Sequence, residues 1–277
     1  FFQGIQKMRY ITILNMSGRI CTMLGIFLLV KSPDDYILAA FLQACTPLIA
    51  GVFSIVWLRK HYTGLFKWPT IGEIINSYKE GWSIFVSSLA VNLYTATNVV
   101  VLGMLTNNVI VGYYSAADKL ITCVRRGIYA VSDAIYPFIS KMMKDNIPKG
   151  LQFIKKQLLL YLVVGLVGCT SLFFFSDTIV KLLFGADYNL TVDVLRILSF
   201  VPLAVAISTV FGEETMLPLN MNSAYSRTLV LAAFFSLLSI FPLCYLWGAK
   251  GVAMTMLLTE FLIMIIMGGL LRKQLFQ

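Results

Sequence analysis

The fold is decided by residues 224–271, which read AYSRTLVLAAFFSLLSIFPLCYLW, then GA, then KGVAMTMLLTEFLIMIIMGGLL. These are two apolar segments, 224–247 and 250–271, separated by a very short connector. A helix needs roughly 20 consecutive apolar residues to cross the hydrocarbon core of a bilayer, and each segment has that length. The pair therefore predicts two membrane-spanning helices joined as a tight hairpin.

The rest of the 277-residue chain has the same character. Hydrophobic residues make up 58% of it and charged residues 13%, about half of the ~25% charged content of soluble domains. This composition excludes a disordered tail, a disulfide scaffold and a collagen-like chain. We expect an all-α polytopic membrane protein with about eight transmembrane helices. The predicted spans are 11–30, 36–58, 82–105, 109–138, 157–175, 192–212, 224–247 and 250–271.

The net charge of +9 does not indicate nucleic acid as a partner, because the basic residues lie between apolar segments. Most of them fall on alternate connectors, with clusters in 59–81 and 139–156. The positive-inside rule places these connectors in the cytoplasm, together with both ends of the chain. Residues 59–81 are the longest such connector and a candidate boundary between two bundles. Residues 176–191 are predicted to form a short interfacial helix ended by Gly185.

Charged and polar residues interrupt the predicted span 109–138 at helical spacing. They are Asp118, Thr122, Arg125, Tyr129 and Ser132, flanked by Lys119, Arg126 and Asp133. This spacing places them on one broad stripe of the helix. Each charge costs about 2.5–3.5 kcal/mol at the centre of a membrane helix, so the five charges would cost about 10 kcal/mol or more against lipid. We therefore expect the stripe to face an aqueous cavity or partners inside the bundle.

The cations of this stripe outnumber its two aspartates, which favours an anionic substrate. Arginine suits phosphate because its planar fork donates two hydrogen bonds at once. The candidate substrate-binding residues are Arg19, Tyr94, Asn98, Lys119, Arg125 and Arg126. Alternatively, Asp118 and Asp133 pair with the cations and lock helices together, or the arginines reach the headgroups.

Two further polar features lie in predicted spans. Tyr94 and Asn98 belong to a polar face that either contacts a sugar or joins helices. Glu260 is a carboxylate deep in the last span, and either couples an ion or accepts a bond from a neighbouring helix. Asp118, Asp133 and Glu260 are the candidates for ion coupling.

Nothing in the sequence indicates an enzyme, a metal site or a cofactor. There is no Gly-rich phosphate loop, no nucleophile elbow and no cluster of metal ligands. The five cysteines lie in apolar segments at wide spacing and are interpreted as packing residues.

Several short segments resemble the bacterial polysaccharide-unit flippases of the O-antigen flippase type. They run in that family's order along the chain: 2–8 (FQGIQKM), 93–98 (LYTATN), 111–119 (VGYYSAADK), 136–141 (YPFISK), 182–188 (LLFGADY) and 248–253 (GAKGVA). Gln6 stands where the family often has Glu, so no role is assigned to it.

The resemblance implies a MATE-like transporter of twelve helices in two lobes, of which this chain would be the C-terminal two thirds. Residues 1–58 would hold the last two helices of the N-terminal lobe, 59–81 the linker between the lobes, and 82–277 the six-helix C-terminal lobe. The implied activity is the translocation of oligosaccharide linked to undecaprenyl pyrophosphate across the bacterial inner membrane by alternating access. Membrane lipids and a polysaccharide polymerase are the other implied partners. An ion-coupled multidrug exporter, a peptidoglycan-precursor flippase and a membrane polymerase are the alternatives.

Overall fold

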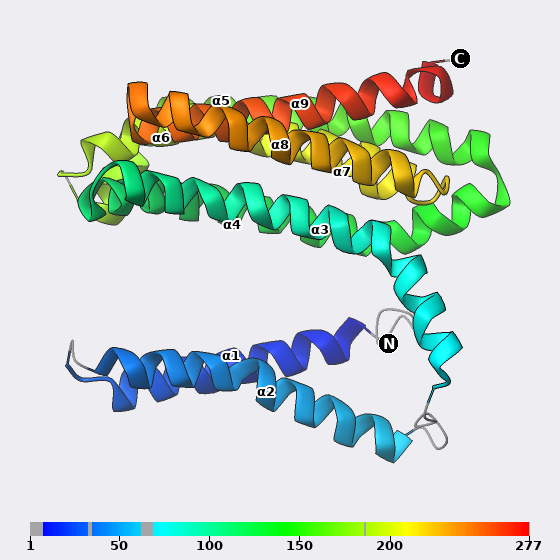
Figure 1. The fold of residues 1–277 in the computed structure, drawn as a ribbon, viewed down its shortest axis with the longest axis horizontal. Helices are drawn as coiled ribbons and strands as arrows, with labels where there is room; N and C mark the ends of the chain where they lie inside the picture. The colour runs from blue at the N-terminus through cyan, green and yellow to red at the C-terminus, as the bar shows by residue number, and fades with distance from the viewer. Residues whose placement is uncertain (1–7, 33–34, 62–68, 186, 277) are drawn as a thin grey trace. The chain divides into compact units, whose positions relative to one another are not determined.

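The computed structural model describes residues 8–32, 35–61, 69–185 and 187–276, and within them it is helical with no strand. Figure 1 shows long helices packed side by side within each part of the chain. The elements are α1 (Met8–Leu29), α2 (Tyr36–His61), α3 (Ile71–Leu105), α4 (Asn108–Asp145), α5 (Ile147–Phe184), α6 (Asn189–Leu198), α7 (Val201–Phe211), the π-helix η2 (Gly212–Met216), α8 (Asn222–Trp247) and α9 (Ala249–Phe276). The all-α class predicted from the sequence is confirmed.

Each predicted span falls on helical residues, with the span 192–212 divided between α6 and α7. Among the described residues, five helical stretches are long and apolar enough to cross a membrane. They are Ile84–Leu105, Ile147–Phe184, Asn189–Met216, Asn222–Trp247 and Ala249–Arg272. Met16–Leu29 in α1 is a shorter apolar stretch. The chain is therefore a polytopic membrane protein.

The chain forms two compact units, which we call the first unit (Phe1–Ile74) and the second unit (Ile75–Gln277). In the first unit, α1 and α2 pack on each other as a hairpin. The carboxylate of Asp35 accepts hydrogen bonds from the backbone N–H groups of Lys31 and Ser32, at 3.0 and 2.9 Å, and these bonds lower its pKa. The assignment of 1–58 and 82–277 to two lobes stays a prediction, and residues 62–68 of the predicted linker lie outside the described residues.

The helix ends follow from local side-chain chemistry. Thr70 and Glu73 form a capping box at the start of α3: the backbone N–H of Thr70 donates to the Glu73 carboxylate at 2.8 Å, and the Glu73 N–H donates back to the Thr70 hydroxyl at 3.4 Å. Asn146 ends α4 through its N–H and begins α5 through its side-chain oxygen, so a single residue turns the chain between two long helices.

The prediction of a separate interfacial helix in 176–191 is wrong. α5 continues without a break to Phe184, and Gly185 ends it at a φ of 100°, a conformation that favours glycine. The amphipathic pattern of residues 176–191 suggested a separate helix. Asp177 and Lys181, which lie in this segment, belong to α5. They form an ion pair one helical turn apart, at 2.8 Å, on an exposed face of the continuous helix.

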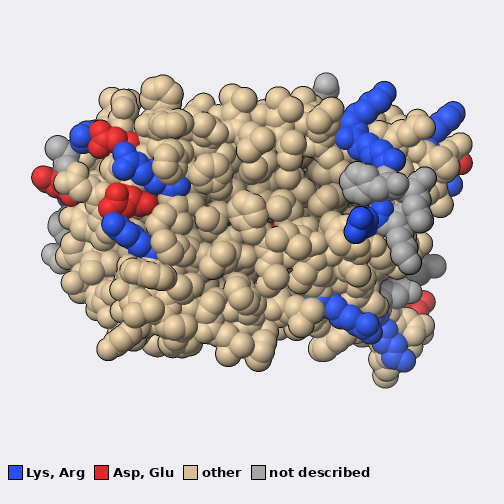
Figure 2. Space-filling view, turned by 90° about the horizontal axis from the view of Figure 1, so that it is seen from above, with Lys and Arg blue, Asp and Glu red and all other residues tan. Residues whose placement is uncertain are grey.

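Burial differs sharply among the helices of the second unit. Of the most apolar window of Asn189–Met216, 72% is buried inside the protein, whereas the corresponding figure for α5 is 6%. The stretch α6–α7–η2 is thus central, and α5 turns nearly all of its apolar surface outward. Figure 2 shows one face on which charged side chains gather at the two ends, with a belt nearly free of them between. Such a belt is expected of a surface that meets the hydrocarbon core.

Candidate functional site

An ion pair with a tyrosine partner lies in the middle of the second unit. A terminal nitrogen of Arg125 in α4 is 3.8 Å from Oε1 of Glu260 in α9. The hydroxyl of Tyr94 in α3 donates to the same oxygen at 3.0 Å. Tyr94 and Glu260 each lie near the centre of an apolar membrane span. Three helices therefore meet through polar groups at the depth where lipid would solvate them worst.

The surroundings of this triad are apolar on both sides along the helices. Toward one end, Ile121 and Met256 belong to a buried cluster that also contains Leu102 and Leu195. Toward the other end, a second buried cluster includes Ile139 and Ile263, along with Ala232. Arg125 and Glu260 lie between the two clusters in sequence, and their side chains are only 11% and 4% exposed. Each of the two charges is therefore stabilised by the other, because neither is solvated by water.

The Arg125–Glu260 pair joins α4 to α9, as an ion pair that locks helices together would. The carboxylate in it is Glu260 and not one of the two aspartates of α4. The sequence analysis considered Asp118 and Asp133 as partners for the cations of α4. In the structure Glu260 is the carboxylate paired with Arg125, while Asp118 is half-buried and Asp133 is exposed. The pairing was invisible in the sequence because 135 residues separate the two partners.

Two more carboxylates lie on the π-helix η2, where α7 ends. Glu213 is half-buried and Glu214 is fully buried. The backbone N–H of Leu217 donates to the carbonyl of Gly212 at 3.1 Å, which is the wider spacing of a π turn. Gly212 is required here because a Cβ would lie 2.6 Å from the ring of Tyr225. η2 thus packs tightly against α8 and points its two acids into the second unit.

A small cavity of about 50 Å³ adjoins both sets of polar groups. Tyr94, Tyr129, Glu213, Tyr225 and Glu260 supply part of its lining, together with Ser208 and Thr209 of α7. A buried space of this size holds one or a few water molecules, given polar partners such as these. The volume of this cavity is far too small for a sugar, so in this conformation it suits water or a small ion.

The other predicted substrate residues fall into three different environments. Asn98 is buried, and its side-chain oxygen has no hydrogen-bond partner among the described residues. Lys119 and Arg126 are exposed on α4. Arg19 is exposed on α1 in the first unit. Of the six predicted residues, the structure brings together only Tyr94 and Arg125, through Glu260.

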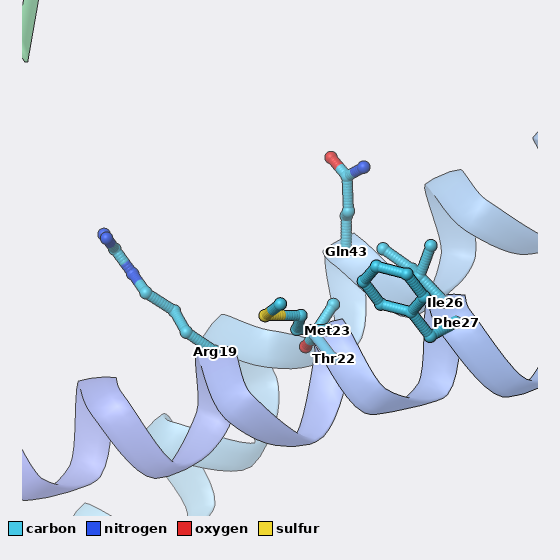
Figure 3. Close-up of a pocket in the computed structure, with 6 residues that line it drawn as sticks. All are labelled: Arg19, Thr22, Met23, Ile26, Phe27 and Gln43. Carbon is cyan, nitrogen blue, oxygen red and sulfur yellow. The ribbon is translucent and has the colours of Figure 1, made fainter.

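Arg19 borders a pocket in the first unit. This pocket of about 430 Å³ is lined by Arg19, Thr22, Met23, Ile26, Phe27 and Gln43. Figure 3 shows Arg19 on α1 and Gln43 on α2 with their polar ends on the same side of the hairpin, and Phe27 further along α1. The pocket therefore offers a cation and an amide beside apolar surface.

Sequence reasoning missed Glu213 and Glu214. Hydropathy placed the end of the predicted span at residue 212, so the pair was treated as part of a connector. The usable signal was two adjacent acids between the apolar run 201–211 and Met216-Leu217, since such a position seldom carries two carboxylates. In the part of the chain that the structure describes, no group of three or more His, Cys, Asp or Glu side chains could hold a metal ion.

Comparison with known proteins gives relatives that cover nearly the whole chain. It is 30% identical over 269 residues to a Shigella dysenteriae protein named "Putative O-antigen transporter", covering 96% of this chain and 66% of that protein. A protein of the same name from Escherichia coli (strain K12) is 31% identical over 268 residues, covering 95% and 63%. The "Probable low-salt glycan biosynthesis flippase Agl15" of Haloferax volcanii is 25% identical over 243 residues, covering 87% and 50%.

The chain spans about two thirds of the length of the first two relatives and half of the third. No solved structure matches it closely enough for comparison. A family model described as "Polysaccharide biosynthesis protein" matches residues 1–143, which include α1 to α3 and most of α4. The chain therefore belongs to the polysaccharide biosynthesis protein family.

Proposed function

We propose that the full-length protein is a flippase that moves lipid-linked oligosaccharide units across the bacterial inner membrane to its outer leaflet. The observation that carries this proposal is the alignment of nearly the whole chain with proteins named as O-antigen transporters and as a glycan flippase. The carrier would be undecaprenyl pyrophosphate, and a polysaccharide polymerase would use the product. The membrane-spanning helices of the chain suit such a cargo, whose lipid tail stays in the bilayer.

The phosphate groups would bind to the exposed cations of α4 and α1. Arg125 is already compensated by Glu260, whereas Lys119 and Arg126 are exposed and appear in none of the ion pairs found among the described residues. An arginine exposed at this place on α4 would be costly against lipid, which favours a watery surface or an anionic ligand at Arg126. Arg19 would contribute in the same way from the first unit.

Transport would follow alternating access, in which two lobes rock around the cargo. Tyr94 and Asn98 would reach a sugar only in a conformation that opens the bundle, because both are buried here. Release of Arg125 from Glu260 would accompany that opening and expose a further cation to the cargo. Asp118, Asp133 and Glu260 remain the candidates for coupling this movement to an ion gradient.

Translocation of a fluorescent lipid-linked oligosaccharide by the full-length protein in vesicles tests the proposal. The variant Lys119→Gln/Arg126→Gln should lower the rate about tenfold or more, since charge-assisted hydrogen bonds contribute about 1.5–3 kcal/mol each. Lys144→Gln is the matched control, because Lys144 is also an exposed lysine of α4 but lies in its last turn. Its rate should equal that of the wild type.

Equal rates in the double variant and the control would reject the cationic site. A wild-type protein that moves no lipid-linked oligosaccharide, but exports drugs or moves peptidoglycan precursors, would reject the proposed function itself.

A further inference from the structure

A second buried polar cluster in the second unit is separate from the Arg125–Glu260 pair. Its centre is Glu214 on η2, which is fully buried and whose two carboxylate oxygens have no hydrogen-bond partner among the described residues. Polar side chains close to it include Ser132 of α4 and Gln157 of α5. These three residues come from three different elements and are 0%, 2% and 6% exposed.

The neighbours of Glu214 share its lack of partners. Both polar atoms of the Gln157 amide and the hydroxyl of Tyr161, one turn further along α5, are buried without a hydrogen bond in the described structure. Together with the carboxylate, five polar atoms converge on one small region. Buried polar groups are nearly always satisfied, so a concentration of open donors and acceptors indicates an ion, a proton or water between them.

The charge of Glu214 has no protein counter-ion. The ion pairs found among the described residues join Arg125 to Glu260, Lys181 to Asp177 and Lys250 to Asp193, and none involves Glu214. The titratable groups that face Glu214 are Tyr161 from α5 and the adjacent Glu213. Around Glu213 lie Asp133 of α4 and Tyr225 of α8, so this environment holds acids and phenols and offers no cation.

An ionised carboxylate in this position would be unstable. Moving an unpaired charge out of water costs several kcal/mol even after the protein relaxes. Proteins meet this cost by pairing the charge or by neutralising it. The described residues supply no cation to pair with it, so a bound cation would neutralise the charge.

We propose that Glu214, Gln157 and Ser132 form a binding site for one monovalent cation, either a proton or Na⁺. Their carboxylate, amide and hydroxyl oxygens are hard donors of the kind that a small hard cation prefers. A bound proton makes the same carboxyl neutral and turns it into a donor toward the amide oxygen of Gln157. The π turn favours this assignment, since π-helical turns within α-helices frequently occur at functional sites.

The site is distinct from the residues named above for ion coupling. Glu260 already has Arg125 and Tyr94 as partners, and Asp133 is exposed. The proposal also stands independently of the cargo, since it rests on the buried groups of the second unit alone.

The test uses the full-length protein in nanodiscs and two measurements. The first is the melting temperature at pH 8 in NaCl against choline chloride. The second is the infrared C=O stretch of protonated carboxyl groups at pH 7 without sodium. The variant Glu214→Gln is permanently neutral and nearly isosteric. Glu213→Gln is the matched control, because it removes the adjacent carboxylate on the same turn.

A sodium site predicts that NaCl raises the melting temperature of the wild type and of Glu213→Gln, by roughly 2–4 °C, and leaves Glu214→Gln unchanged. A proton site predicts no sodium effect and a C=O band that is absent only from Glu214→Gln. If the wild type shows neither the sodium response nor a band that depends on Glu214, the proposal is overturned. Should Glu214→Gln fail to fold, Gln157→Leu serves in its place, and it must weaken the sodium response or shift the band.

Discussion

The buried pair between Arg125 and Glu260 makes a quantitative prediction about stability. The charged atoms are 3.8 Å apart. At an effective dielectric constant of about 20, Coulomb's law gives an attraction of about 4 kcal/mol at that distance. Replacing either residue alone by Met leaves the other charge buried and uncompensated, which should lower the free energy of unfolding by about 3–5 kcal/mol. Replacing both removes the two charges of this pair together, so neither is left uncompensated.

The double variant should therefore lose much less free energy of unfolding than the sum of the losses of the two single variants. We expect a coupling energy of about 2–4 kcal/mol from the double-mutant cycle. Reversible unfolding by SDS in mixed micelles, followed by tryptophan fluorescence or circular dichroism, measures each free energy. The reasoning is refuted if the single effects add to within about 0.5 kcal/mol, because the two side chains would then act independently.

Three further outcomes can be checked on the same protein. The exposed pair between Lys250 and Asp193, at 2.7 Å, should show a coupling of less than about 1 kcal/mol in the same cycle, because water screens it. Gly212→Ala should lower the free energy of unfolding by about 1–3 kcal/mol, because its Cβ would overlap the ring of Tyr225. Hydrogen bonds from Thr70 lower the pKa of Glu73 below its ordinary value of 4.5. The added stability of the first turn of α3 is therefore present above that pH and is lost as pH falls below it. The measurement is the amide-exchange protection factor of that turn, corrected for the intrinsic pH dependence of exchange, which should fall in acid in the wild type and stay level in Glu73→Gln.

Each of these has a result that would contradict it. Gly168→Ala is the control for Gly212→Ala, since no atom lies within 4 Å of a Cβ there, and equal losses in both variants would argue against the steric explanation. A coupling for Lys250 and Asp193 as large as that of Arg125 and Glu260 would show that burial is not what sets the energy. Amide-exchange protection factors at the start of α3 that stay constant between pH 6 and pH 3 would exclude a role for Glu73.

The helices and the polar stripe of α4 were predictable from the sequence, because hydropathy and a period of 3.6 residues are local properties. The partner of Arg125 was not predictable, since only the packing of α9 on α4 brings Glu260 to it. The cluster around Glu214 could not be predicted from the sequence for a related reason. Ser132 and Gln157 are ordinary polar residues in their own helices, and they become a site only when η2 brings a carboxylate between them.

The break expected near residue 176 shows the opposite error. Residues 176–191 were expected to form a separate amphipathic helix, but Asp177 and Lys181 pair one turn apart and α5 continues through them. Local composition therefore indicates where helices exist more reliably than where they end.

The outward-facing surface of α5 should tolerate amino-acid substitutions better than the buried helices do. Because so little of its apolar window touches the other described helices, one apolar residue there should serve nearly as well as another. Natural variation should accumulate along α5 and be scarce along α6 and α7. The same surface makes the protein responsive to its host bilayer: a helix of 38 residues is about 57 Å long, nearly twice the hydrocarbon thickness, so thinner or thicker lipids should change its tilt before they disturb the core.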